Sequence, residues 1–240
     1  MVIVFWWLAT GLTIAMQRAD AIGAAGRTCM FALGIAGLWI VARTRAERSA
    51  RSARAAFLGA SLLWWCSAAL FYSGWGMRIP AVARGAAGSA ALAVQAVQAT
   101  LVPDLVGVLL LAVLVVLTRR APNRVSAHTF FVFWATLQMA KLNVFFGVVN
   151  PGTELLPSNL AGLRLFFGPS VNSALLPVSV ALLALLTAYV TRTALRSRDE
   201  HVRHASMMLA VLLALAVLEH VLLGVSVGPP MYDVFLRMRG

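Results

Sequence analysis

Six polar residues stand inside stretches of the chain that are otherwise apolar enough to cross a membrane. They are Asp104, Gln138, Lys141, Asn143, Glu219 and His220. A charged side chain at the centre of a bilayer costs about 3 kcal/mol on insertion scales, so such residues usually form ion pairs, carry protons or bind ligands. The six residues therefore predict a buried polar cluster that joins three helices.

Lys141 needs a carboxylate partner at a similar depth in the membrane. Counted from the more basic end of each stretch, Asp104 lies about 14 residues deep, Lys141 about 16 and Glu219 about 15. At about 1.5 Å per residue, these depths are roughly 21 to 24 Å, so all three lie in one layer. We expect Glu219 to be the first partner of Lys141, with Asp104 as the alternative. Gln138 lies three residues before Lys141 and shares its helix face.

A structural ion pair explains this cluster more simply than a site for a metal, a proton or a polar ligand. Glu219 and His220 are only weak metal candidates, because adjacent helical residues project about 100° apart and a nearby lysine repels a cation. The sequence has no glycine-rich phosphate loop, nucleophile motif or paired metal-ligand spacing. No catalytic residue is assigned, and a role without catalysis is favoured over an enzyme.

The composition indicates an all-α, polytopic transmembrane bundle. Of the 240 residues, 61% are hydrophobic and only 12% are charged, about half the charged share of a soluble domain. About seven spans are expected within a single membrane domain, residues 1–240, and residues 158–167 are expected to form a surface helix. The expected spans are about 2–16, 27–42, 55–75, 89–117, 126–147, 173–190 and 204–227. Cys29 and Cys66 are expected to be free thiols.

The net charge of +12 comes from arginines in the short connections, which favours membrane topology and lipid headgroups over nucleic acid. Twelve arginines fall on one side of the predicted membrane and seven on the other, so the first side, with the N-terminus, is expected in the cytoplasm. The seven tryptophans could line a pigment or quinone pocket, but anchoring at the interface and packing explain most of them.

Several motifs together resemble one known family. They are Trp6–Leu12, Ala140–Gly147, Asn150 with Glu154–Pro157, Leu160–Phe167, Pro177–Ser179 and Leu215–His220. They keep their order over most of the chain, and this resembles the PuhE family of photosynthetic complex assembly proteins of purple bacteria. The resemblance implies a polytopic protein linked to reaction-centre assembly and to bacteriochlorophyll supply.

The chain departs from the family pattern at two places. Where the family carries a His-Glu pair this chain has Pro103-Asp104, and where the family carries a glutamate it has a stretch ending at Ala68. With Glu219 and His220, those family residues would make a carboxylate and histidine metal site. The resemblance therefore implies a diverged member in which such a site is lost or weakened.

The leading expectation is an assembly factor or accessory subunit of a photosynthetic reaction-centre or light-harvesting complex in the bacterial inner membrane. It would contact lipid, complex subunits and, through its aromatic side chains, bacteriochlorophyll, carotenoid or quinone. The alternative is a membrane-embedded metal- or redox-dependent enzyme of bacteriochlorophyll or quinone metabolism that uses Glu219 and His220. A proton-coupled transporter is disfavoured because the seven expected spans show no internal repeat.

Overall fold

The fold is built from α-helices that run roughly along one common direction. The computed structural model describes residues 1–15, 24–81 and 90–226, and no strand occurs among them. The helices are α1 (Val2–Ala15), α2 (Ala24–Thr44), α3 (Ala50–Tyr72), α4 (Ala90–Thr118), α5 (Val125–Phe146), α6 (Leu175–Arg196) and α7 (Glu200–Leu223). Two 3-10 helices, η1 (Thr153–Leu155) and η2 (Ser158–Phe166), lie between α5 and α6.

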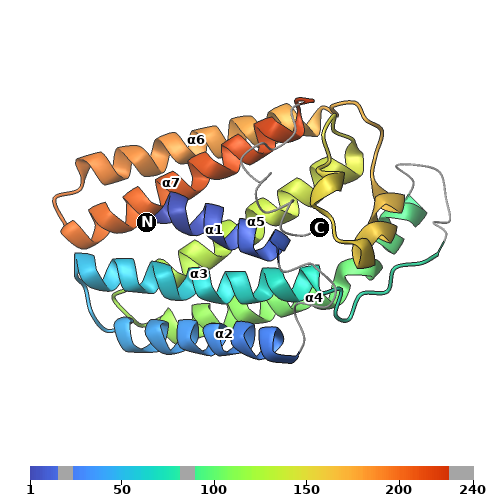
Figure 1. The fold of residues 1–240 in the computed structure, drawn as a ribbon. Coiled ribbons are helices and arrows are strands. Elements are labelled where there is room, and N and C mark those ends of the chain that lie inside the picture. The colour runs from blue at the N-terminus through green and yellow to red at the C-terminus, as the bar shows by residue number, and fades with distance from the viewer. Residues whose placement is uncertain (16–23, 82–89, 227–240) are drawn as a thin grey trace.

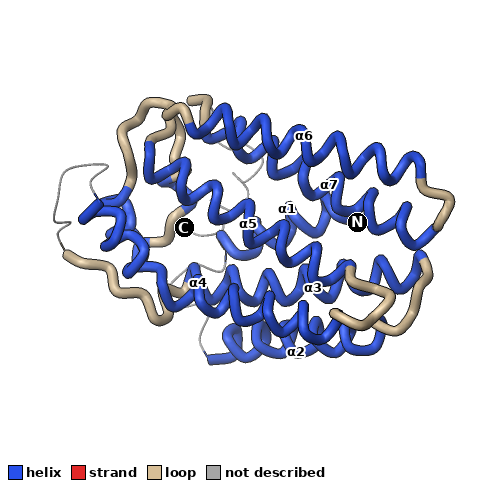
Figure 2. Tube along the Cα trace, turned by 180° about the vertical axis from the view of Figure 1, so that it is seen from behind, coloured by secondary structure: helices blue, strands red, loops and turns tan. Residues whose placement is uncertain are grey.

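The helices form two edges with α5 between them. In Figures 1 and 2, α6 and α7 lie side by side along one edge, and α2 and α3 lie side by side along the other. The shorter α1 crosses one side of the bundle and contacts both α3 and α7. Among the described residues, five helices, α3 to α7, are long and apolar enough to cross a membrane, and α1 and α2 contain the shorter apolar stretches Val2–Thr13 and Thr28–Thr44. The expected all-α membrane bundle is confirmed, and the count of seven spans stays a prediction.

The predicted boundaries differ from the observed ones mainly at the charged connections. The connection expected over residues 192–203 is only Ser197–Asp199, because α6 continues to Arg196 and α7 already begins at Glu200. Arginine and glutamate are good helix formers, so these ends remain helical outside the apolar stretch. The expected surface helix is the 3-10 helix η2, whose Leu160, Leu163 and Phe166 are buried. Residues 16, 89 and 227, at the ends of three expected spans, lie outside the described residues.

The core of the bundle is rich in aromatic side chains. Trp64 of α3 stacks on Phe133 of α5 with the ring centroids 5.5 Å apart, and it meets Phe130 edge-on at 5.6 Å. Phe57 and Phe130 are almost completely buried. In contrast, α4 and α6 expose large hydrophobic side chains on their outer faces, as helices in contact with lipid do.

Helices α2 and α3 pack closely against each other at two glycines. A Cβ atom on Gly37 of α2 would lie 2.6 Å from the main-chain oxygen of Gly59, and a Cβ on Gly59 would lie 2.7 Å from the oxygen of Gly37. No real Cβ atom tolerates such a distance from a carbonyl oxygen. Small residues thus set the α2–α3 distance, as is common between membrane helices.

Three arginine-rich connections meet at one end of the bundle and are joined by hydrogen bonds. The Asn123 side-chain Nδ2 donates to the carbonyls of Thr44 (3.1 Å) and Ser52 (3.2 Å), and its Oδ1 accepts from the Val125 amide. Arg48 pairs with Asp199 at 2.7 Å. The Val202 amide, with help from Arg48, holds the pKa of the Asp199 carboxyl below its ordinary value. This end is the one expected to face the cytoplasm.

Replacing Asn123 with alanine should weaken this end of the bundle. Asn123 is 1% exposed, so the change leaves the buried Val125 amide without this acceptor and removes one donor from each of the Thr44 and Ser52 carbonyls. We expect the free energy of unfolding to fall by about 2 kcal/mol, measured by titration with sodium dodecyl sulfate in mixed micelles. The control is Asn159→Ala, which removes a single exposed hydrogen bond to Tyr72 and should cost about 0.5 kcal/mol. Equal effects of the two changes would contradict this account.

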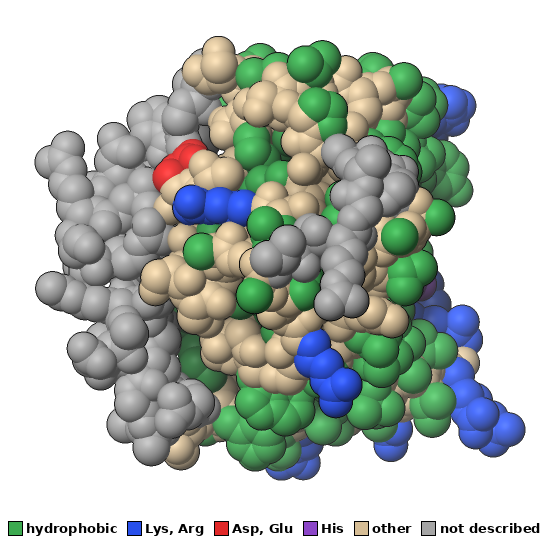
Figure 3. Space-filling view, turned by 90° about the vertical axis from the view of Figure 1, so that its right-hand side faces the viewer, with side chains coloured by type: hydrophobic (Ala, Val, Ile, Leu, Met, Phe, Trp, Pro, Cys, Tyr) green, Lys and Arg blue, Asp and Glu red, His purple; other side chains and the backbone are tan. Residues whose placement is uncertain are grey.

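The opposite end is closed by the long connection from α5 to α6. The Gly168 amide donates to Val144, the Ser173 amide donates to Gly147, and the Asn150 amide donates to Leu223, which ties the connection to α5 and α7. Gly147 has φ 117°, a conformation that favours glycine. Seen end-on, hydrophobic side chains lie beside a few basic and acidic ones at this end (Figure 3).

Candidate functional site

A polar cluster between α4 and α5 contains the only lysine of the chain. Lys141 Nζ donates to Asp104 Oδ1 at 2.5 Å, and Gln138 Nε2 donates to the same oxygen at 3.1 Å. Thr100 donates its hydroxyl proton to Asp104 Oδ2 at 2.8 Å. Lys141 Nζ also lies 4.9 Å from the ring centre of Phe71. We call Thr100, Asp104, Gln138 and Lys141 the α4–α5 cluster.

The helical spacing explains why these four side chains meet. Thr100 and Asp104 are four residues apart on α4, and Gln138 and Lys141 are three apart on α5, so each pair shares one helix face. The side chains of Lys141 and Asp104 are 24% and 26% exposed. The hydrogen-bonded ion pair thus links α4 to α5.

The expectation that Glu219 is the first partner of Lys141 is wrong. The ion pair is made with Asp104, and Glu219 Oε1 instead accepts a hydrogen bond from Trp6 Nε1 at 2.7 Å. Equal depth in the membrane is necessary for pairing with Lys141, but it is not sufficient. The direction in which a side chain leaves its helix also decides which partner it meets. Lys141 faces α4, and Glu219 faces α1.

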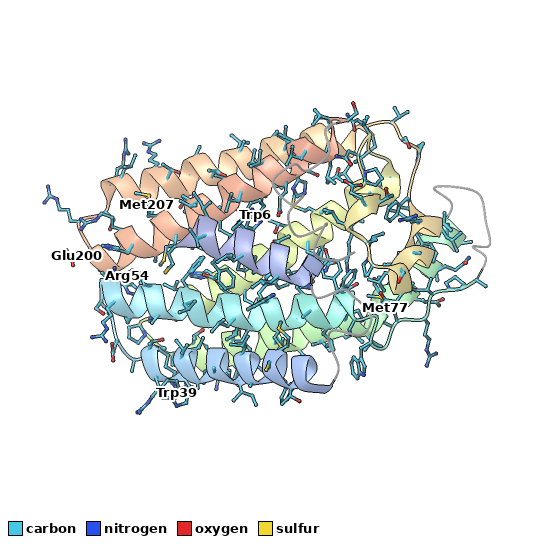
Figure 4. The ribbon with its side chains drawn as sticks, viewed as in Figure 1. Trp6, Trp39, Arg54, Met77, Glu200 and Met207 are labelled. Carbon is cyan, nitrogen blue, oxygen red and sulfur yellow. The ribbon has the colours of Figure 1, made fainter. Side chains whose placement is uncertain are left out.

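Glu219 lines a partly open cavity of about 200 Å³ that is bordered by α1, α3, α5 and α7 together with Leu155. Figure 4 shows its partner Trp6 on α1, beside α7. The Glu219 side chain is exposed and borders this space, which we call the Glu219 cavity. Seven of its lining side chains are aromatic: Phe5, Trp6, Trp64, Trp65, Phe71, Tyr72 and Phe133.

The α4–α5 cluster and the Glu219 cavity lie on opposite sides of a layer of side chains from α3 and α5, which we call the wall. A second, much smaller cavity of about 20 Å³ is bordered by Asp104 and Gln138. The two cavities share Trp64, Ala68, Phe71 and Leu137 in their linings. Ala68, singled out in the sequence as a place where a carboxylate is missing, lies in this wall.

Asn143 and His220 lie neither in the α4–α5 cluster nor in the lining of the Glu219 cavity. Asn143 comes two residues after Lys141, about 200° around α5, and its Nδ2 donates to Ser179 of α6 at 3.0 Å. The His220 Nδ1 lies 2.8 Å from the Ala216 carbonyl and therefore carries the proton, because a carbonyl only accepts. Asn143 Oδ1 and His220 Nε2 are buried without a hydrogen bond to any described residue.

The six polar residues are thus divided among different neighbours. Glu219 and His220 point to different sides of α7, which gives a metal ion no shared approach. Within the described part of the chain, no three His, Cys, Asp or Glu side chains are placed to hold a metal ion together. The arrangement can fix two helices through an ion pair and can offer one carboxyl group to an aromatic cavity.

Trp6, Trp64 and Trp65 contribute to a cavity, although anchoring at the interface and packing were expected for most of the tryptophans. All three line the Glu219 cavity, and Trp65 Nε1 also donates to Thr13 Oγ1 at 2.9 Å. Their spacing gives no sign of this, because Trp6 lies 213 residues from Glu219 in the chain.

Comparison with known proteins places the chain in a family. No solved structure is significantly similar to it. A protein of Rhodobacter capsulatus, described as an "uncharacterized 30.4 kDa protein in puhA 5′ region", is 29% identical over 228 residues, which cover 90% of this chain and 81% of that protein. The family DUF3623, described as a protein of unknown function, matches residues 1–230. The chain is therefore a member of the DUF3623 family.

Proposed function

We propose that this membrane protein is an assembly factor or accessory subunit of a photosynthetic reaction-centre or light-harvesting complex in the bacterial inner membrane. The observation that carries the proposal is its relationship, over 90% of the chain, to a protein of the puhA 5′ region. The order of motifs that resembles the PuhE family supports the same function. The twelve arginines of the basic side would face the cytoplasm.

The outer faces of α4 and α6 are the surfaces best suited to such a role. Leu109 of α4 is 63% exposed and Leu185 of α6 is 69% exposed, and both helices carry further exposed aliphatic residues. These faces meet lipid in an isolated protein. They can equally receive the transmembrane helices of a complex, or the apolar parts of a bacteriochlorophyll, carotenoid or quinone, without exposing any main-chain polar group.

Site-specific crosslinking tests this proposal directly. A photoreactive amino acid at position 109 or 185 should crosslink to reaction-centre or antenna polypeptides in photosynthetically grown cells. The control is position 114 on α4, where Leu114 is fully buried and should give no crosslink to another chain. If positions 109 and 185 yield lipid adducts alone while the complexes assemble, the proposal is wrong.

The second candidate is a membrane enzyme of pigment or quinone metabolism, and the Glu219 cavity is the observation that favours it. The cavity holds one carboxyl group among aromatic rings, as a site for proton transfer to a flat substrate would. About 200 Å³ is too little to enclose a tetrapyrrole macrocycle, so a substrate inside it would have to be smaller. Turnover of such a substrate that is lost in Glu219→Gln would support this candidate.

A further inference from the structure

We infer that the Glu219 cavity is a binding site for the ring of a small, lipid-soluble aromatic molecule that bears a hydroxyl group, as phenols and quinols do. The inference goes beyond the proposed function and does not depend on it. It rests on the size of the cavity, its lining and the position of its one carboxyl group.

The size fits one substituted ring or two fused rings. An apolar cavity of about 150 Å³ in a protein core is known to hold benzene. The Glu219 cavity, at about 200 Å³, has room for a somewhat larger flat molecule. It lies among membrane-crossing helices, so a ligand would reach it from the lipid phase.

The lining selects for an aromatic ligand. Side chains from three helices, α1, α3 and α5, present seven aromatic rings to one space. Aromatic rings favour stacked or edge-to-face partners, and such pairs add to the stabilisation that comes from the burial of apolar area. The remaining wall is made of small or aliphatic side chains such as Ala9, Ala68 and Leu212, which leave the space open and apolar.

Several polar groups of the lining are already hydrogen-bonded, whereas one carboxylate oxygen is not. The Thr13 and Thr136 hydroxyls donate to carbonyls of their own helices at 2.7 and 2.9 Å, and the indole of Trp65 donates to Thr13. Glu219 Oε1 accepts a hydrogen bond from Trp6 Nε1, whereas Oε2 accepts no hydrogen bond from any residue that the structure describes. A hydroxyl on the ligand can donate to this second oxygen, which gives the site one fixed orientation for a ring.

The test uses two probes of equal size, 2-naphthol and 2-methylnaphthalene, which differ by a hydroxyl and a methyl group. Affinities are measured with the full-length protein in detergent micelles, by saturable changes in melting temperature and by equilibrium dialysis. We expect 2-naphthol to bind on the order of tenfold more tightly, since a hydrogen bond to a carboxylate contributes about 1.5 kcal/mol or more.

Three variants locate the binding. Glu219→Met keeps the side-chain length and removes the acceptor, so the tenfold preference for 2-naphthol should disappear. Ala68→Leu fills the cavity and should weaken the binding of both probes. Glu200→Met is the control, because Glu200 lies on the same helix, exposed, at the basic end, and it should change neither affinity.

Two results would overturn the inference. One is an equal affinity of the unaltered protein for the two probes, which would exclude a role for the carboxyl group. The other is binding that survives both Glu219→Met and Ala68→Leu, which would place the probes elsewhere on the protein or in the micelle. If Ala68→Leu fails to fold, Glu219→Met and the comparison of probes still decide the question.

Discussion

Replacing Lys141 with methionine should lower the free energy of unfolding by about 3 to 5 kcal/mol. The change leaves the Asp104 carboxylate in the membrane without its cation, while the methionine keeps most of the volume of the lysine. Thr100 and Gln138 can still donate to Asp104, but neither carries a positive charge. Denaturation in mixed micelles and the amount of protein that accumulates in the membrane both report this loss.

Double variants identify the partner of Lys141. Lys141→Met with Asp104→Asn removes both charges of the α4–α5 cluster and should recover a large part of the lost stability. Lys141→Met with Glu219→Gln should recover none, because Glu219 bonds to Trp6 on the other side of the wall. Recovery with Glu219→Gln and none with Asp104→Asn would contradict the observed arrangement.

Gly37→Val should cost about 3 kcal/mol, at the upper end of the range for overpacking. Its Cβ atom would meet the main-chain oxygen of Gly59 at 2.6 Å, and a main-chain atom cannot turn aside as a side chain can. The helices α2 and α3 would have to separate, which opens packing around Val41 and Leu63.

The matched control for this change is Ala36→Val. Ala36 is the preceding residue of α2 and is exposed, so the added methyl groups point away from α3. We expect a change within about 0.5 kcal/mol, as for other surface substitutions. Comparable losses in Gly37→Val and Ala36→Val would show that helix propensity, and not close packing of α2 on α3, sets the effect.

Much of the fold can be predicted from the sequence because membrane helices appear in it as long apolar stretches. Each of the seven expected stretches contains a helix that covers most of its described residues, and Pro103 lies within α4 as expected. The ends are less predictable, since charged residues such as Arg196 and Glu200 continue a helix beyond the apolar part. Length and hydropathy say where a helix crosses, but they do not say where it stops.

The candidate site was only partly predictable, for a geometric reason. Counting residues places Asp104, Lys141 and Glu219 at one depth, and within α5 it places Gln138 beside Lys141. The rotation of each helix about its axis, however, depends on the packing of the whole bundle. That rotation sends Lys141 to Asp104 and Glu219 to Trp6, and it brings three tryptophans to one cavity. A single sequence does not encode such contacts in a local pattern.

The most direct test of the proposed function is gentle detergent purification of the tagged protein from photosynthetically grown cells. On one sample, the co-purifying chains are identified, the absorption spectrum is recorded and metals are analysed. We expect reaction-centre or antenna polypeptides in stoichiometric amounts and no stoichiometric metal. A pure single chain that carries a bound metal or a redox-active chromophore would contradict it and would make Glu219 and His220 the first residues to replace.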